Sequence, residues 1–592
     1  MAVMIAGDYK TKFQKLEMLR VELETEIQSW KTHWQEIVDN LCPTTPKLFT
    51  PDRYRGDRRN KNIVDETGVL ALRTAVAGMM AGIFSPARPS FRLTTSNPDL
   101  NENEAVKEYL YDVTRRMSDI FSKSNLYPSL NMHYEDALAF GTSALFLEED
   151  MENVIHTTQI PLGSYMLACD EKGQINTFFR VFTMTIYQLV SKFAKRDKNG
   201  NPDWSNFSLS VKNMWEKGQR QTPIPVCHVI YPNDDYQEGM LGPKGKKYSS
   251  CYYEQGKGEA GYGPDGNDNY DRYLSESGYD YFPVMVTRWS ICAGDVYATM
   301  CPGMAALGSL KSLYMIEKDI LTASKKKLNP PLKAHSSLKK SSVVMSPGGI
   351  TWVDNQDADK SIMPLFNVDF NTRDASEKQV EIRTRINQDF FADLFLSLSI
   401  REQQGGQPVT ATEINAMEKE RLMALGPVLE RENQDLLEPL IDQTYIFMNK
   451  RGLLPEPPPE LQGMNLKIEF ISVLAQAQKL MGLSSIQNFL AIVQPFVELN
   501  PESLLKVDFE QLIDEAADIL GVPPRVIRSD EKVLAMKAQL AQQQQAAQAP
   551  ERAKALESAT QAGKNLSETD TEGDNALTDI LSQLKQRQAV AA

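Results

Sequence analysis

The N-terminal part of the chain carries apolar side chains at the period of an α-helix. Between residues 9 and 41 they recur every three or four positions, which places them on one helical face. That face carries Leu16, Leu19, Leu23, Ile27, Trp30, Trp34 and Ile37. Pro43 lacks a backbone N–H and ends the pattern. Similar patterns predict three further helices, at residues 65–84, 103–124 and 128–140.

The pattern changes between residues 144 and 290. Short runs such as "TFFRVFTMT" and "PVMVTRW" are typical of strands, and loops rich in Gly, Asn, Asp and Pro separate them. Residues 254–282 have the most loop-like composition of this section. We therefore expect residues 1–301 to form an α-rich front section followed by a β-rich one.

A pair of helices is predicted further along, at residues 302–327 and 373–397. The first has apolar side chains at Ala306, Leu310, Leu313, Ile316 and Ile320. Its last turn holds Lys325, Lys326 and Lys327, whose charge complements the helix dipole. In the second, the side chains expected to face inward are Val380, Ile386, Phe390 and Phe395. Between the two, residues 328–372 hold the short β runs "SVVMS" and "ITWVD" around a Pro-Gly-Gly turn, which predicts a hairpin.

A polar loop and a long helix follow. The loop "REQQGGQP" cannot be regular, because Gly405 and Gly406 are entropically costly to order and Pro408 disfavours helix at the residue before it. Thr410 and Glu413 then form an S/T-x-x-E capping box, which predicts a helix from residue 410 to about 451. We expect this helix to be kinked near Gly426-Pro427.

The C-terminal part divides by composition. Residues 470–545 are helical in period, whereas residues 546–592 are polar, rich in Ala, Gln and Ser and poor in aromatic side chains. Such a tail buries too little apolar area to offset the entropy of ordering, so we expect part of it to be disordered. The fold class predicted for the whole chain is α+β, mainly helical.

Composition limits the partners and the compartment. At 592 residues and 42% hydrophobic the chain can bury a large core. Its net charge of −14 argues against tight electrostatic binding to nucleic acid. The six cysteines lie far apart without CxxC pairs, and neither a secretory leader nor a run of 18 apolar residues is found. A reducing cytoplasm and no membrane are expected.

Catalytic and metal-binding motifs receive little support. The five histidines show no HxxxH spacing, and no Walker loop or GxSxG elbow occurs, so we expect no enzyme and no cofactor. One weak metal candidate has the spacing of a calcium loop: Asp265, Asn267, Asn269, Asp271 and Glu276. Its sixth position is Tyr270, where the sharp turn requires Gly. An acidic surface loop is the alternative interpretation of this segment.

The order of these elements resembles the portal, or head-to-tail connector, proteins of short-tailed bacteriophages of the podovirus type. The resemblance covers roughly residues 10–535. It rests on "SWKTHWQEIVDNLCP", "GMMAGIFSPARPSFRL", "RWSICAGDVYATMCPGMAALGSLKSL", "KKLNPPLKA", "PGGITWVD" and "VTATEINAMEKERLMALGPVLERENQDLLEPLIDQTYIFMNKRGLLP". The last of these is the most specific.

The resemblance implies a ring, usually of twelve subunits, at the unique capsid vertex. Double-stranded DNA would pass through it during packaging and ejection, without sequence specificity. The implied partners are the large subunit of the terminase motor, a tail adaptor, and the major capsid and scaffold proteins. The implied location is the virion, after assembly in the host cytoplasm.

The resemblance also assigns regions. Residues 1–301 and 410–469 would be the wing, 302–327 and 373–397 the stem, 328–372 the clip, 398–409 the tunnel loop and 470–545 the crown or helical barrel. It implies basic stem residues facing the channel at Lys325, Lys326 and Lys327. The implied tunnel-loop residues are Arg401, Gln403, Gln404, Gly405, Gly406 and Gln407. The implied clip interface is Val343, Val344, Ile350 and Trp352.

Two other classes of protein stay open at this stage. A different virion assembly protein, such as a scaffold or tail component, could use the same long helices, although an extended scaffold would lack the β-rich section. A metal-dependent hydrolase could be built around residues 265–276. Only the portal interpretation requires a ring with a central hole.

Overall fold

The computed structural model describes part of the chain, in two units. The units are Met1–Ser96 with Tyr109–Gly521, and Asn97–Glu108 with Val522–Ala592. The described residues are 12–43, 62–85, 90–95, 97, 100, 103–196, 200–255, 273–328, 332–334, 362–364, 372–393, 425–461, 466–470, 511–513 and 533–540. The elements below belong to the first unit, apart from the first turn of α4. In the second unit, residues 533–540 are helical.

The helices of the front section are found close to their predicted positions. They are α1 (Lys12–Leu41), α2 (Thr67–Gly82), α4 (Glu104–Lys123) and α5 (Leu126–Phe140). The α1 helix buries Leu16, Leu23, Ile27, Trp34, Ile37, Val38 and Leu41, whereas Leu19 and Trp30 are only partly covered. The ring of Trp34 stacks on that of Trp30 and meets Tyr297 edge-on, which fixes α1 to the core. The predicted amphipathic period is therefore confirmed.

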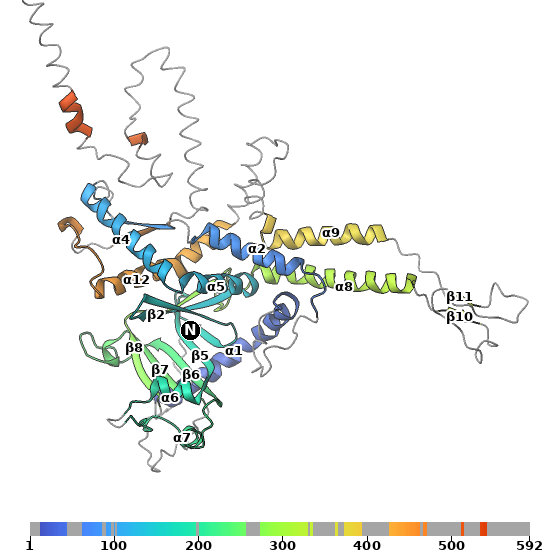
Figure 1. The fold of residues 1–592 in the computed structure, drawn as a ribbon, viewed down its shortest axis with the longest axis horizontal. Coiled ribbons are helices and arrows are strands. Elements are labelled where there is room, and N and C mark those ends of the chain that lie inside the picture. Colours follow the sequence, from blue (N-terminus) through green and yellow to red (C-terminus); the bar gives the residue numbers. More distant parts are fainter. Residues whose placement is uncertain are drawn as a thin grey trace, which may run out of the picture. The chain divides into compact units, whose positions relative to one another are not determined.

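The β-rich section folds into two antiparallel sheets (Figure 1). One has the order β3-β2-β9, from β2 (Thr142–Asp150), β3 (Val154–Ile160) and β9 (Val284–Arg288). The other is a meander of β4 (Tyr165–Cys169), β5 (Ile175–Thr185), β6 (Pro223–Pro232), β7 (Tyr248–Glu254) and β8 (Ser275–Tyr279). The strand β8 corrects the prediction that residues 254–282 are loop, because Ser275 pairs with Tyr252 of β7. Residues 256–272 lie outside the described part.

One glycine makes the passage from helix to sheet possible. Gly141 ends α5 with a φ of 82°, a left-handed conformation that side chains other than glycine adopt rarely. A Cβ at this position would lie 2.7 Å from the Cβ of Ala298. The chain can therefore turn directly from α5 into β2.

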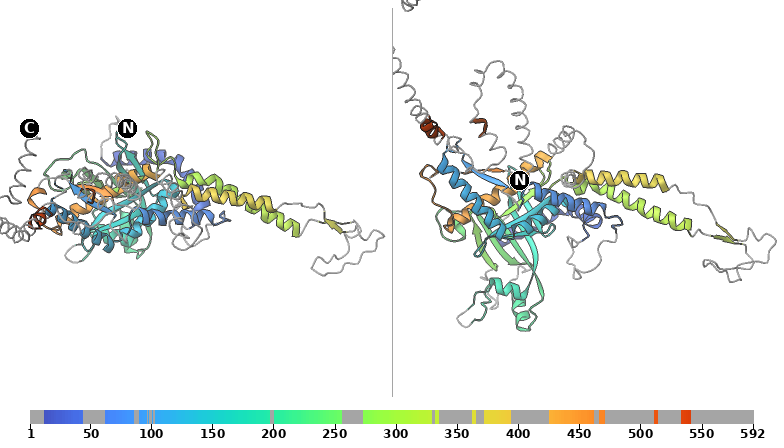
Figure 2. Two further views of the ribbon diagram at one scale, coloured as in Figure 1. Left: turned by 90° about the horizontal axis from the view of Figure 1, so that it is seen from above. Right: turned by 45° about the horizontal axis from the view of Figure 1, so that its top comes forward.

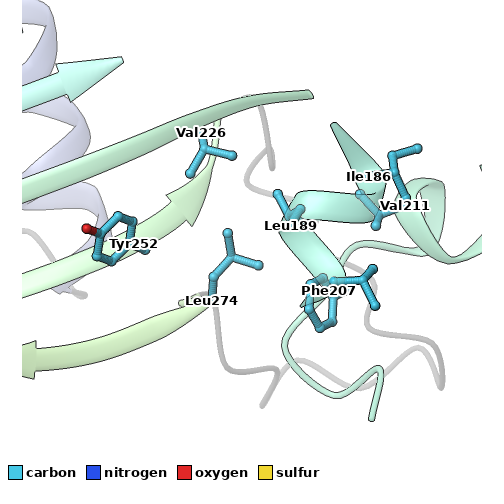
Figure 3. Packing of buried hydrophobic residues seen from close by; sticks show 8 residues of the cluster. Ile186, Leu189, Phe207, Val211, Val226, Tyr252 and Leu274 are labelled. Atoms are coloured by element: carbon cyan, nitrogen blue, oxygen red, sulfur yellow. The ribbon is translucent and has the colours of Figure 1, made fainter. Parts of the chain in front are cut away.

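Two short helices inside the β-rich section were not predicted. They are α6 (Ile186–Phe193) and α7 (Leu209–Glu216). A capping box of Thr185 and Gln188 starts α6, and the Ser208 side chain accepts a hydrogen bond from the first turn of α7. Figure 3 shows their apolar residues packed beside the meander, in a buried cluster that contains Ile186, Leu189, Val190, Phe207, Val211, Val226, Tyr252 and Leu274.

The remaining described elements include two strands, β1 and β12, that pair although they are far apart in sequence. These elements are β1 (Phe91–Thr95), η1 (Pro243–Gly245), α8 (Pro302–Leu328), β10 (Leu332–Ala334), β11 (Ile362–Pro364), α9 (Thr372–Asp389), η4 (Asn433–Leu437), α12 (Glu438–Lys450), η5 (Pro459–Leu461) and β12 (Leu466–Phe470). The strand β1 pairs antiparallel with β12, with Phe91 opposite Phe470. All six cysteines are free thiols in the structure. Mixed helices and sheets confirm the α+β class.

Candidate functional site: the α8–α9 helix pair

The helices α8 and α9 lie side by side in both Figure 1 and Figure 2. At the end of the pair nearest the sheets, both helices have buried apolar side chains. They are Ala306, Leu307, Leu310, Leu313 and Tyr314 of α8 and Ile382 and Ile386 of α9. The first turn of α8 packs directly on α5, because a Cβ on Gly303 would lie 2.2 Å from the Ala139 carbonyl oxygen. This end of the pair is therefore part of the core.

Polar contacts attach both helices to the front section. The Tyr314 hydroxyl donates to the Asn40 carbonyl at 2.7 Å, and Lys311 is paired with Glu36. From α9, the guanidinium of Arg383 donates to Asp65 at 2.7 and 3.2 Å and to Glu317 at 2.9 Å. Burial pushes the pKa of Asp65 upward, but the hydrogen bonds from Thr67 and Arg383 outweigh it and leave that pKa below its usual value. One arginine thus links α9, α8 and the segment before α2.

Further from the core, the same helices expose large apolar side chains. The exposed fractions are 65% for Met315, 51% for Leu321, 86% for Leu328 and 60% for Val380. The inward prediction for Val380 is therefore wrong: the buried side chains of α9 are Gln379, Ile382 and Ile386. Ile382 lies two positions from Val380, which places it on a different side of the helix. These exposed apolar side chains are available for contact with another protein.

The three lysines at the end of α8 are exposed to solvent. Lys325, Lys326 and Lys327 occupy the last turn, as predicted, and they form no ion pair with the residues that the structure describes. Just beyond them, β10 and β11 pair antiparallel, with Leu332 opposite Pro364. The two segments leaving the helices are thus joined as strands. The predicted hairpin, with Val343, Val344, Ile350 and Trp352, lies outside the described residues and stays a prediction.

The predicted tunnel loop, with Arg401, Gln403, Gln404, Gly405, Gly406 and Gln407, also lies outside the described residues. The structure does describe what comes before it. The helix predicted for 373–397 is interrupted, since α9 stops at Asp389, Phe391 has a φ of 56° and residues 392–393 are helical again. Residues 394–397, with the predicted inward Phe395, lie outside the described part. Phe390 is fully buried at this break and fastens the end of α9 to the core.

The long helix after the loop contains an irregular turn that the sequence analysis did not predict. Residues 425–432 are helical, whereas the predicted start of this helix at Thr410 lies outside the described residues. The kink predicted near Gly426-Pro427 stays a prediction. The irregularity is the π-turn η4, where the Glu438 N–H donates to the Asn433 carbonyl. Pro439 follows at the start of α12 and accounts for it, because the proline ring clashes with a carbonyl one turn earlier.

Buried polar groups surround this π-turn where it packs against β9. Burial and the nearby Asp435 carboxylate raise the pKa of Glu432 to about 8. The pKa of Asp435 is also raised by burial, which Arg288 of β9 opposes. Next to them His133 is held between the hydroxyls of Thr287, at 2.8 Å, and Ser143, at 2.9 Å. Burial lowers the pKa of His133 to about 3, so its imidazole is neutral.

The signal that could have located this cluster is weak. The helix reads "ERENQDLLEP", and acids in such a stretch normally face solvent. The packing of this segment against β9 buries Glu432 and partly buries Asp435. No sequence period distinguishes them from the exposed acids nearby.

Only one of the five residues of the weak metal candidate lies in the described part of the chain. Glu276 lies in β8, where its carboxylate is paired with Lys12 Nζ at 2.5 Å. The other four residues, Asp265, Asn267, Asn269 and Asp271, are outside the described part. Among the described residues no group of three or more His, Cys, Asp or Glu side chains could hold a metal ion. In that same part of the chain, no helix is both long enough and apolar enough to span a membrane.

Known proteins are similar to this chain along nearly its whole length. Residues 13–527 match the family described as bacteriophage head to tail connecting protein. The portal protein of Salmonella phage epsilon15 is 40% identical over 571 residues, which cover 96% of this chain and 98% of that protein. The probable portal protein of Bordetella phage BPP-1 is 38% identical over 560 residues, 94% of this chain and 96% of that protein. The chain therefore belongs to the family of bacteriophage head-to-tail connecting proteins.

Proposed function

We propose that this chain is a portal subunit, which forms a ring at the unique capsid vertex through which double-stranded DNA is packaged and ejected and to which the tail attaches. The observation that carries the proposal is the α8–α9 pair. It is anchored by Gly303 and Arg383 at one end, and it exposes Met315, Leu321, Leu328 and Val380 beyond. Burying these side chains against the same helices of neighbouring copies removes apolar surface from water.

Each region then has a part in the ring. The α8 and α9 helices form the stem, residues 328–372 the clip and residues 398–409 the tunnel loop. Residues 1–301 and 410–469 form the wing, and residues 470–545 the crown. We assign the clip to contact the terminase large subunit during packaging and the tail adaptor afterwards. The wing contacts capsid and scaffold proteins, and we propose twelve subunits, assembled in the host cytoplasm.

The charge of the chain supports a conduit for DNA. A net charge of −14 repels the phosphates of a duplex, so that the duplex slides without being held. Lys325, Lys326 and Lys327 supply a few weak contacts in the stem. The proposal is thus of a structural assembly and not of an enzyme.

Negative-stain imaging of the purified full chain tests the proposal. The expected result is a closed ring with a central hole, and averaging along the ring axis counts its subunits. Extended or irregular particles contradict it and favour a scaffold or tail protein. A discrete monomer that hydrolyses a substrate only with added metal favours the hydrolase interpretation.

A further inference from the structure

The two unpredicted helices form a lobe with its own chemistry. We define the α6–α7 lobe as residues 186–196 and 200–222, which comprise α6, α7, the described residues between them and the turn after α7. Its apolar side packs beside the meander through the cluster in Figure 3. The lobe is therefore held by a core of its own while its other side faces solvent.

The charge of the lobe is opposite to that of the chain. Residues 186–222 contain seven basic and three acidic side chains, a net charge of +4, in a chain of net charge −14. Six of the basic side chains belong to described residues: Lys192, Lys195, Arg196, Lys212, Lys217 and Arg220. All but Lys212 are exposed, and Lys212 is partly exposed.

These cations lack acidic partners within the described part of the chain. None of the six forms an ion pair there, whereas Lys12, Arg20, Lys246, Arg383 and Arg451 all do. An unpaired cation near others of its own sign is electrostatically unfavourable, and an anionic partner relieves that repulsion. The lobe therefore has the charge of a surface for an anion.

One of the cations is held in a fixed position. The guanidinium of Arg220 lies 4.7 Å from the centre of the Trp215 ring, and the Tyr187 ring stacks parallel to Trp215 with an interplanar angle of 11°. The backbone of Arg220 also accepts a hydrogen bond from the Tyr187 N–H at 3.0 Å. A guanidinium that rests on an aromatic face keeps its N–H groups available for a phosphate.

We propose that the α6–α7 lobe is a binding surface for the sugar-phosphate backbone of duplex DNA, separate from any channel. Lysines contribute four of the six described cations, and lysine is depleted at protein–protein interfaces, whereas Lys and Arg make most phosphate contacts. This composition favours DNA over an acidic protein partner. The binding is independent of base sequence and weak at physiological salt, with a Kd of about 10⁻⁴ to 10⁻⁶ M.

The experiment uses a covalently closed DNA minicircle, which cannot thread a ring and so reports only on outer surfaces. Binding of the full chain is measured by fluorescence anisotropy at a series of NaCl concentrations. The variant Lys195→Ala/Arg196→Ala/Lys217→Ala removes three exposed charges of the lobe. We expect a loss of affinity of about tenfold or more at low salt, and a decrease of up to about 2.7 in the slope of log K against log salt, at roughly 0.9 per phosphate contact.

The matched control is Lys172→Ala/Lys244→Ala/Lys247→Ala, which removes the same charge from exposed positions outside the lobe. It is expected to bind the minicircle as the parent does. Equal losses in both variants, or parental binding by the lobe variant, overturn the proposal. So does a lobe variant that keeps its DNA affinity but no longer assembles, because the lobe would then be a protein interface. Ring formation by the parent is measured separately, by the negative-stain imaging described above. A parent that forms rings but shows no binding through the lobe contradicts this proposal and not the proposed function.

Discussion

Arg288 of β9 places its guanidinium Nε 4.0 Å from a carboxylate oxygen of Asp435 in the π-turn η4. Both atoms are buried and lack a hydrogen-bond partner in the part of the chain that the structure describes. The same guanidinium also donates to the Gly173 carbonyl at 3.0 Å. Arg288 thus joins the three-stranded sheet to both the meander and the helix that follows the predicted tunnel loop.

Removing that arginine takes away the cation closest to the buried carboxylate oxygen of Asp435. We expect Arg288→Gln to lower the free energy of unfolding by about 3 kcal/mol, the magnitude found when one partner of a buried pair is lost. The control Arg385→Gln breaks an exposed pair with Glu381 and is expected to change stability by less than about 1 kcal/mol. Urea unfolding of both variants checks the difference, and equal effects would contradict a buried role for Arg288.

Stability is expected to fall with rising pH because of Glu432. Its folded pKa of about 8 lies above the ordinary 4.5, so the folded state retains a proton that the unfolded state has lost. Between these two values the free energy of unfolding falls by up to about 1.4 kcal/mol per pH unit. Above the folded pKa no further loss occurs. Asp435 and Tyr134 are the titratable groups that interact with Glu432, and Arg288 and Arg431 in turn lower the pKa of Asp435.

The variant Glu432→Gln isolates this contribution. We expect it to gain stability relative to the parent as pH rises from 6.5 to 8, measured by urea unfolding at each pH. The lowered pKa of His133 adds a small rise in stability near pH 6.5, but that contribution is the same in parent and variant. Asp136, whose pKa burial raises to about 8, contributes equally to both proteins. Parallel pH profiles for parent and variant would refute the assignment.

Replacing glycine with alanine is expected to have opposite effects on stability at two positions of α8. Gly303→Ala places a Cβ against the Ala139 carbonyl oxygen, which cannot move aside because it belongs to the backbone of α5. The substitution is expected to lower the free energy of unfolding by about 1–3 kcal/mol. Gly308→Ala meets nothing within 4 Å and is expected to stabilise the helix by up to about 1 kcal/mol. Thermal unfolding of the two variants gives the signs. A stabilising Gly303→Ala would mean that α8 and α5 are further apart.

The exposed side chains of the helix pair should control assembly. We expect Met315→Glu/Leu321→Glu to fold normally but to form few or no rings, because charge replaces the apolar groups that neighbouring copies cover. Leu241→Glu is the control, since Leu241 is fully exposed on a loop outside the pair. Size-exclusion chromatography with light scattering gives the mass. Normal rings from the double variant would disprove the stem assignment.

The predicted tunnel loop is tested by stiffening it. Gly405→Ala/Gly406→Ala restricts the backbone while leaving the neighbouring residues unchanged. Rings are expected to form normally, whereas DNA packaging or retention in filled heads falls. The yield of filled heads and the leakage of DNA from them are the measurements. Parental values for both would show that residues 398–409 are an ordinary connection.

The sequence by itself determined the elements whose signals are local. The period of α1 is set by side chains three and four residues apart, and the end of α8 by its lysines and the prolines after it. Alternation in "TFFRVFTMT" likewise predicted β5. These patterns act within one element, so the residues that create them are neighbours in the chain.

Only the tertiary structure decided which faces are covered and which distant residues meet. Val380 and Ile382 are both apolar, but α8 and α2 cover only one side of α9, so one is exposed and the other is buried. The pairing of β1 with β12 and the approach of Arg288 to Asp435 join residues far apart in sequence. No local period records such contacts, because burial of an acid or exposure of a valine depends on what packs against it.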